Sequence, residues 1–166
     1  MSKDKKKQMG ILGLAIALVV VLAGSIIFVG AVSGWFDDPK ISLDEEYYCE
    51  NSSCDGSFTN LTAEEYEALI NNHKSFVIFV DQGGCHTADR LRGYIEDYSR
   101  ESGIKFYRIM FADAKDSSLH EYVKYYPSAA IISKGKPVVW LHADSDEDAE
   151  RYNNYDEFKA WIQNYL

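Results

Sequence analysis

Hydrophobic positions fall into three patterns along the chain. Residues 9–36 form a long apolar stretch without a single charged side chain, and about 20 apolar residues suffice to cross the hydrocarbon core of a bilayer. Residues 76–80, Phe-Val-Ile-Phe-Val, form a short apolar run typical of strands that are buried on both faces. Elsewhere apolar residues recur at intervals of three and four, as in helices with one buried face. The pattern therefore predicts a membrane-spanning helix followed by a domain that contains both strands and helices.

Cap and turn residues set the expected bounds of the elements in this domain. Thr62 and Glu65 have the spacing of a capping box at a helix start, and Gly103 stands where a helix would end. Helices are expected at residues 62–72, 85–102, 118–125 (opened by a second capping box at 118–121) and from 154 onward, and strands at 57–59, 75–81, 104–111, 129–133 and 137–142. Strand–helix–strand crossovers imply parallel neighbours, and the last two strands form an antiparallel hairpin. This order predicts an α/β fold, with a mixed sheet flanked by helices on both faces.

Charge is distributed unevenly along the chain. Lys3, Lys5, Lys6 and Lys7, together with Asp4, give the first eight residues a net charge of +3, whereas the remainder carries −12 from 13 basic and 25 acidic residues. Because a strongly acidic domain repels phosphate groups, nucleic acid is not an expected partner. Because basic residues stay on the cytoplasmic side of a membrane helix, we expect a single-pass protein of the cell membrane with a cytoplasmic N-terminus and an extracytoplasmic C-terminal domain.

The expected organisation has four parts. They are a basic cytoplasmic tail at 1–8, a transmembrane anchor at 9–36, an acidic linker at 37–55 with a short edge strand at Tyr47 and Tyr48, and the α/β domain at 56–166. An alternative for the apolar stretch is a cleaved signal peptide, with Ala31-Val32-Ser33 as the cleavage site. The apolar core of a signal peptide normally runs about 7–15 residues. The greater length of this stretch favours an uncleaved anchor.

Cys85 follows the turn residues Asp81-Gln82-Gly83-Gly84 and stands where the next helix would begin. The free N–H groups and the positive dipole end of a helix start favour a thiolate, and a charged His86 would add to this effect. Cys85 is therefore a candidate nucleophile, and His86 is a candidate thiolate stabiliser. Alternatively, Cys85 is only a small residue at a helix start, and His86 is only a surface histidine.

Two further cysteines, Cys49 and Cys54, precede Cys85 in the sequence. Disulfides form and persist outside the cytoplasm, so we expect one pair and one odd thiol. Cys49 and Cys54 could pair across a short loop, or one of them could pair with Cys85. The sequence leaves both arrangements open.

Neither a metal nor a cofactor is expected. The histidines and cysteines do not have the spacing of a zinc site. Asp144, Asp146 and Asp148 alternate like the start of a calcium loop, but Ala149 and Tyr155 occupy the positions at which that loop needs glycine and glutamate. A solvated acidic loop is therefore expected at 144–154.

Residues 56–166 resemble the thioredoxin-fold family. The resemblance rests on the strand at 76–80, on a cysteine at the following helix start, and on Tyr126-Pro127-Ser128 before a strand–Lys-Gly-Lys–strand hairpin. In that family a Cys-x-x-Cys motif lies beside a cis-proline, to which Pro127 corresponds. The resemblance implies that Tyr126, Pro127 and Ser128 bind an extended peptide next to Cys85.

The motif departs from the family pattern at three positions. Ala88 stands where the family has its second cysteine, and Gly84 stands where the family usually has a tryptophan before the nucleophile. Phe79 replaces the acidic residue that the family often buries six positions before the nucleophile. Thiol–disulfide exchange needs an attacking thiolate and a resolving thiol. The sequence therefore excludes a dithiol oxidoreductase of the ordinary kind.

Two hypotheses of function follow, and the sequence indicates no oligomeric state. The first is a membrane-tethered binding or accessory module for a protein or peptide partner, with a degenerate redox motif. The second is a monothiol redox protein in which Cys85 forms mixed disulfides that Cys49, Cys54 or an external thiol resolves. The loss of three aids to catalysis favours the first.

Overall fold

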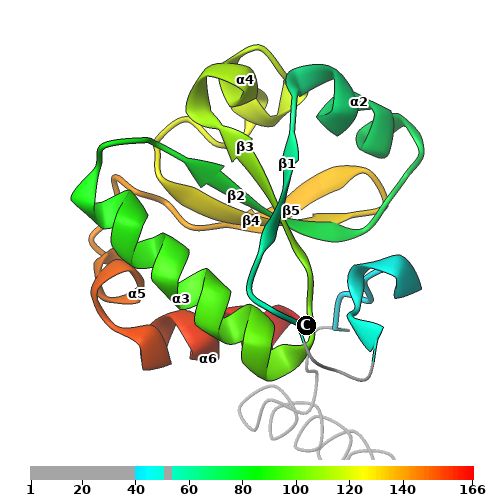
Figure 1. Ribbon diagram of the computed structural model, residues 1–166. Coiled ribbons are helices and arrows are strands. Elements are labelled where there is room, and N and C mark those ends of the chain that lie inside the picture. Colours follow the sequence, from blue (N-terminus) through cyan, green and yellow to red (C-terminus); the bar gives the residue numbers. More distant parts are fainter. Residues whose placement is uncertain (1–39, 51–53) are drawn as a thin grey trace, which may run out of the picture. The chain divides into compact units, whose positions relative to one another are not determined.

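A five-stranded sheet forms the centre of the domain (Figure 1). The computed structural model describes residues 40–50 and 54–166. The strands are β1 (Phe58–Leu61), β2 (Phe76–Asp81), β3 (Phe106–Met110), β4 (Ser128–Ser133) and β5 (Lys136–Trp140), in the order β1-β3-β2-β4-β5 across the sheet. β1, β3 and β2 run parallel, whereas β4 is antiparallel to both β2 and β5. The predicted mixed sheet, with a parallel centre and an antiparallel hairpin at one edge, is confirmed.

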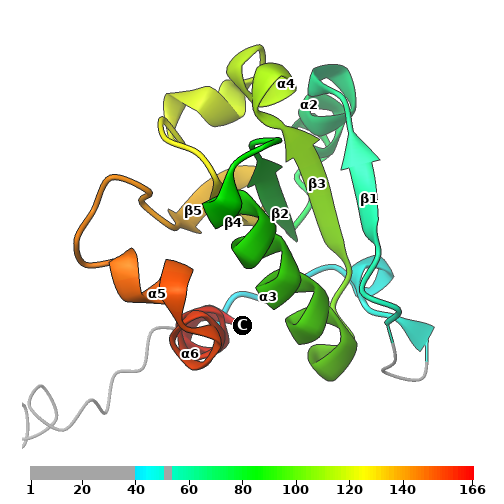
Figure 2. The same ribbon diagram turned by 60° about the vertical axis from the view of Figure 1, so that its left-hand side comes forward.

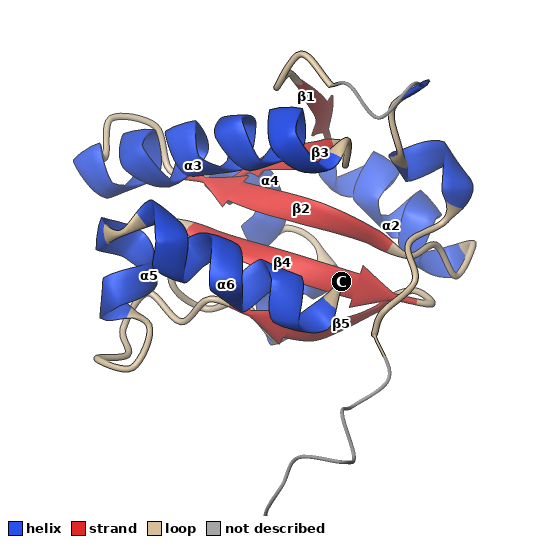
Figure 3. Ribbon diagram, turned by 90° about the horizontal axis from the view of Figure 1, so that it is seen from below, coloured by secondary structure: helices blue, strands red, loops and turns tan. Residues whose placement is uncertain are grey.

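Helices cover both faces of this sheet. The α-helices are α2 (Ala63–Asn71), α3 (His86–Ser102), α4 (Phe111–Lys115), α5 (Ala149–Asn153) and α6 (Tyr155–Tyr165), and the short 3-10 helices are η1 (Glu45–Tyr47) and η3 (Ser118–Glu121). α3, α5 and α6 lie together over one face, and α2 and α4 lie over the other (Figures 2 and 3). The α/β architecture expected from the sequence is therefore confirmed.

The central position of β2 follows from its composition. All six of its residues are buried, and they pair with β3 on one side and with β4 on the other. The helices on either side of β2 begin and end where their cap residues predict. Thr62 and Glu65 form the capping box of α2, and Gly103 ends α3 in the left-handed conformation, with a φ of 71°.

Two short helices were not expected. α4 begins at Phe111, which the sequence placed at the end of a strand, and α5 lies within the stretch expected to be a solvated loop. Each helix has five residues and one buried side chain, Ala114 in α4 and Tyr152 in α5. A helix this short is held by its tertiary contacts and is too brief to produce a recognisable apolar period.

Two other local predictions are wrong. The element expected at 118–125 is the 3-10 helix η3, and its cap is Ser117, whose hydroxyl accepts the N–H of Leu119 at 3.3 Å, so residues 118–121 are not a capping box. Tyr47 and Tyr48 do not form an edge strand. Tyr47 ends η1, and Tyr48 makes an isolated bridge with Ile104.

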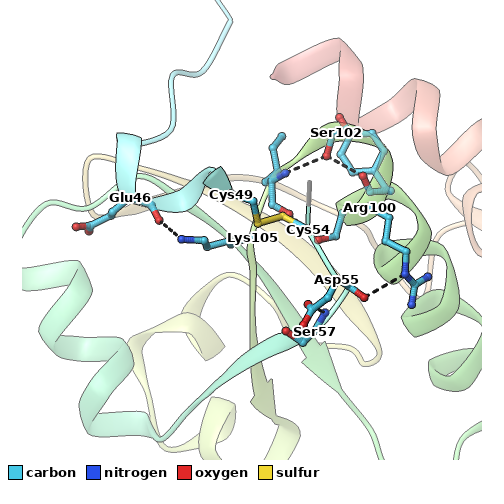
Figure 4. The surroundings of a disulfide bond; sticks show 11 residues. Glu46, Cys49, Cys54, Asp55, Ser57, Arg100, Ser102 and Lys105 are labelled. Carbon is cyan, nitrogen blue, oxygen red and sulfur yellow. Dashed lines mark hydrogen bonds between the residues drawn. A yellow bond between two sulfur atoms is a disulfide. The ribbon is translucent and has the colours of Figure 1, made fainter. Parts of the chain in front are cut away.

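The described part of the segment expected to be a linker packs against the domain. Leu43 and Tyr47 are buried, the N–H of Lys105 donates to the carbonyl of Tyr47 at 2.8 Å, and the N–H of Cys49 donates to the carbonyl of Gly103 at 2.8 Å. Cys49 and Cys54 form a disulfide, which lies next to Arg100 and Lys105 (Figure 4). Residues from 40 onward therefore form one unit with the α/β domain.

The anchor expected at 9–36 lies outside the described residues. Within residues 40–50 and 54–166, none of the helices combines the length and the apolar character needed to cross a bilayer.

The turn between β4 and β5 yields a prediction about stability. Gly135 has a φ of +75°, and a Cβ there would lie 2.3 Å from the carbonyl oxygen of Ile70, whereas Gly84 has a φ of +74° with nothing within 4 Å of its Cβ position. Gly84→Ala is expected to lower the free energy of unfolding by about 1–2 kcal/mol, the usual penalty of the left-handed region for a residue with a Cβ. Gly135→Ala adds a clash with backbone and is expected to cost at least about twice as much. Urea denaturation of both variants measures the difference, and equal losses would contradict this packing of the turn.

Candidate functional site

Strand register brings Cys85 and Pro127 to the same end of the sheet. β2 and β4 are antiparallel, with Val80 opposite Ser128. The residues that follow β2 therefore lie beside the residues that precede β4. Cys85 comes shortly after the end of β2, and Pro127 comes immediately before β4, so the two meet although they are far apart in the sequence.

A cavity of about 380 Å³ lies between these segments, and we refer to it as the groove. Its lining comes from the start of α3, from the segment before β4, and from the segment of residues 143–153. The lining residues are Cys85, Thr87, Tyr126, Pro127, Ala143, Asp144, Ser145, Asp146, Ala149, Tyr152 and Asn153. Three of the residues singled out from the sequence, Cys85, Tyr126 and Pro127, thus share one cavity.

Cys85 is the N-cap residue of α3, and its thiol is free and partly exposed. Its N–H donates to the carbonyl of Gln82 at 3.3 Å, which closes the turn after β2. Ala88, at the position of the second motif cysteine, is completely buried. The motif therefore supplies one accessible sulfur, that of Cys85, and the residue one turn further along the helix belongs to the core.

Cys49 and Cys54 lie at the opposite end of α3 from Cys85. The N–H of Cys49 bonds to Gly103 at the C-terminal cap of this helix, and the 17 residues of α3 span about 25 Å at 1.5 Å per residue. Neither sulfur of that disulfide is near the thiol of Cys85. A thiol that resolves a mixed disulfide on Cys85 would therefore have to come from another molecule.

His86 is exposed at the first position of α3 and contacts Arg90. The guanidinium of Arg90 lies 3.3 Å from Nδ1 of His86, and because arginine has only donors, the imidazole nitrogen accepts. Among the described residues, no hydrogen bond joins His86 to Cys85.

Tyr126 and Pro127 form one wall of the groove. The peptide bond between them is cis, as the family resemblance implied. The carbonyl of Pro127 accepts a hydrogen bond from the Tyr152 hydroxyl at 2.9 Å, and the Tyr126 hydroxyl lies 2.7 Å from Nδ1 of His120. Burial raises the pKa of both tyrosines, so the hydroxyls stay protonated and hold this wall in place.

Among the described residues, no hydrogen bond is made by the N–H or the carbonyl of Tyr126. Pro127 has no N–H of its own, and pairing with β2 begins only at Ser128. An extended segment lying in the groove would therefore find one unpaired donor and one unpaired acceptor at Tyr126.

Ser128 lies apart from the groove. It is completely buried, and its hydroxyl donates to the carbonyl of Leu141 at 2.7 Å. This contact ties the start of β4 to the end of β5. Ser128 thus supports the wall from behind and does not line the cavity.

The opposite wall of the groove was missed by sequence reasoning. Asp148, which is buried, accepts the N–H of His142 at 2.6 Å and pairs with Arg151. These contacts fold the acidic segment back over the groove and place Asp144 and Asp146 on its lining. The spacing of three between Asp148 and Arg151 is the one signal in the sequence that could have indicated an ordered turn here.

Asp81 is a second buried carboxylate, at the last position of β2. Arg92 of α3 contacts both of its carboxylate oxygens at 3.0 Å, and Arg108 of β3 lies 3.6 Å away. The hydrogen bonds to Asp81 raise the pKa of Arg92. This ion pair joins the end of β2 to α3 and so fixes the turn that carries Cys85.

Metal ligands are not gathered at the groove. Within the part of the chain that the structure describes, no three His, Cys, Asp or Glu side chains are placed to hold an ion. The polar groups on the lining of the groove are the thiol of Cys85, the hydroxyls of Thr87 and Ser145, the amide of Asn153, the carboxylates of Asp144 and Asp146, and two tyrosine hydroxyls that are already hydrogen-bonded.

Solved structures similar to this chain include thioredoxins. A thioredoxin mutant from Halobacterium salinarum matches with a TM-score of 0.51 and 12% identity, over 68% of this chain and 94% of that chain. Oxidised thioredoxin from Plasmodium falciparum matches with a TM-score of 0.51 and 15% identity, over 66% and 98%. The sequence matches no protein-family model and no curated protein. The domain therefore has a thioredoxin-like fold, and identities this low establish the fold alone.

Proposed function

We propose that the domain is a thiol-related protein-binding module whose groove receives an extended segment of a partner protein. The observation that carries this proposal is the unpaired backbone of Tyr126 on the wall of the groove. An extended segment that hydrogen-bonds to Tyr126 gains affinity from its main chain, as in complexes in which an extended peptide adds to the exposed edge of a sheet. The thioredoxin-like fold supports the proposal because it places a helix-start cysteine beside this wall.

A second candidate function is a monothiol redox protein, and the free, partly exposed thiol of Cys85 favours it. In this reaction the thiolate of Cys85 attacks one sulfur of a partner disulfide, a new S–S bond forms, and the other partner sulfur leaves as a thiolate. Release needs a thiol from another molecule, because Ala88 is buried and the Cys49–Cys54 disulfide lies at the far end of α3.

Binding to an array of short cysteine-free peptides separates these two functions. Ala149 is exposed on the lining of the groove, and Ala160 is exposed on α6 away from it. Ala149→Trp is expected to weaken peptide binding by roughly tenfold or more, because the indole fills the cavity and costs at least one hydrogen bond to a charged or backbone group. Ala160→Trp is the matched control and is expected to bind normally.

The variant Cys85→Ser decides between the candidates in the same assay. The binding module retains its peptides when the sulfur is replaced, because the contacts come from the backbone and from Tyr126. The redox protein predicts the opposite pattern: cysteine-free peptides do not bind, disulfide-containing peptides become linked to the protein, and Cys85→Ser abolishes that link. Loss of cysteine-free peptide binding in Cys85→Ser, or unchanged binding in Ala149→Trp, would contradict the binding module.

We also propose that residues 9–36 anchor the chain in the cell membrane with this domain on the outer side. The charge pattern around the apolar stretch supports this orientation, and the Cys49–Cys54 disulfide supports it further, because disulfides persist outside the cytoplasm. Protease added to intact cells is expected to remove the domain and leave a short anchored fragment. A domain that becomes sensitive only after lysis would contradict the proposed orientation.

A further inference from the structure

A second cavity adjoins the groove. It has a volume of about 230 Å³ and is walled by Tyr122, Tyr125 and Trp140, and we refer to it as the aromatic pocket. Ala143 and Asp144 line both the aromatic pocket and the groove. The two cavities therefore share a wall, and a segment bound beside Tyr126 lies within reach of both.

Two of the aromatic side chains that line the pocket are exposed to solvent. Tyr125 is 57% exposed and Tyr122 is 40% exposed, values far above those of the tyrosines in the core. The ring of Tyr122 stands nearly perpendicular to that of Trp140, with centroids 5.9 Å apart, and His142 lies beside Trp140 at 5.3 Å. Since an apolar cavity of about 150 Å³ already holds a benzene molecule, the pocket is large enough for one side chain.

The charge around the pocket selects among the side chains that could enter it. Asp144 places a carboxylate on the rim, and the chain beyond its first eight residues carries −12. Aromatic faces attract cations through their quadrupole, and an acidic surface raises the local concentration of cationic groups. Lys124 also lines the pocket, but it is exposed, and its flexible stem lets the ammonium group extend into solvent.

We propose that the aromatic pocket binds an arginine side chain of the partner segment that lies in the groove. This inference rests on the proposed function and names the class of segment that the module selects. A guanidinium can stack on Trp140 or Tyr122 through its planar face and donate to the carboxylate of Asp144 at its edge. An aromatic or aliphatic side chain would fill the same volume but leave the carboxylate without a counter-charge.

Disulfide tethering to Cys85 tests this inference on the full chain. Short glycine–serine peptides, each with one cysteine blocked by 2-mercaptoethanol and one arginine at successive distances from it, are equilibrated with the protein in excess 2-mercaptoethanol. The thiolate of Cys85 attacks the peptide sulfur, the Cys85–peptide bond forms, and 2-mercaptoethanol leaves as a thiolate. The fraction of protein carrying peptide, measured by intact mass, then reports the noncovalent contacts of each peptide.

At one position of the arginine, the arginine peptide is expected to be retained on Cys85 roughly tenfold more strongly than the peptide with norleucine at that position. The corresponding lysine peptide is expected to be retained to an intermediate extent. Tyr125→Leu and Asp144→Asn are expected to reduce the preference for arginine, and Lys124→Gln to increase it. Tyr48→Leu, which removes another exposed tyrosine near Ile104, is the matched control and should leave the preference unchanged.

Failure of this inference is distinguishable from failure of the proposed function. If neutral peptides are retained and arginine adds nothing at any position, or if lysine matches arginine throughout, the arginine pocket is wrong and the binding groove stands. An arginine preference that survives both Tyr125→Leu and Asp144→Asn also overturns it. If no peptide, charged or neutral, occupies Cys85 to a greater extent than 2-mercaptoethanol itself does, the proposed function fails.

Discussion

The pairing of β2 with β4 is the constraint on which the rest of the site depends. β2 is buried along its whole length, so a shift of one residue would exchange its side chains between two differently packed faces and would move Asp81 out of its contact with Arg92. With Val80 opposite Ser128, the turn after β2 and the segment before β4 have only one relative position. Cys85, Tyr126 and Pro127 lie around one groove because this pairing brings the residues after β2 beside the residues before β4.

Buried polar contacts then hold the two walls of the groove. Asp81 joins the end of β2 to Arg92 of α3, Tyr152 donates to the carbonyl of Pro127, and Asp148 holds the acidic segment through the N–H of His142. A polar group buried without such a partner costs about 1–3 kcal/mol, so each contact strongly favours the arrangement observed. Tyr126, whose backbone makes no hydrogen bond among the described residues, and Cys85, whose thiol is free, both line the groove.

Local features of the fold could be predicted from the sequence, and the order of the elements also predicted the mixed sheet, whereas individual side-chain contacts between elements could not be predicted. The apolar run at 76–80, the capping box at Thr62 and the end of α3 at Gly103 are each encoded within a few neighbouring residues. The role of Ser128 depended on the register of β4, which turned its hydroxyl toward Leu141 and away from the groove. The acidic wall was missed for the same reason, because Asp148 is ordered by a backbone N–H that lies outside its own helix.

The proposed function requires one accessible thiol at the groove and a disulfide at the other end of α3. Peptide mass mapping of the protein under non-reducing conditions, after alkylation of free thiols, tests this division most directly. We expect a disulfide-linked pair of peptides that contain Cys49 and Cys54. The peptide that contains Cys85 is expected to carry the alkylating group or a single small thiol. A peptide in which Cys85 is linked to Cys49 or to Cys54 would contradict it.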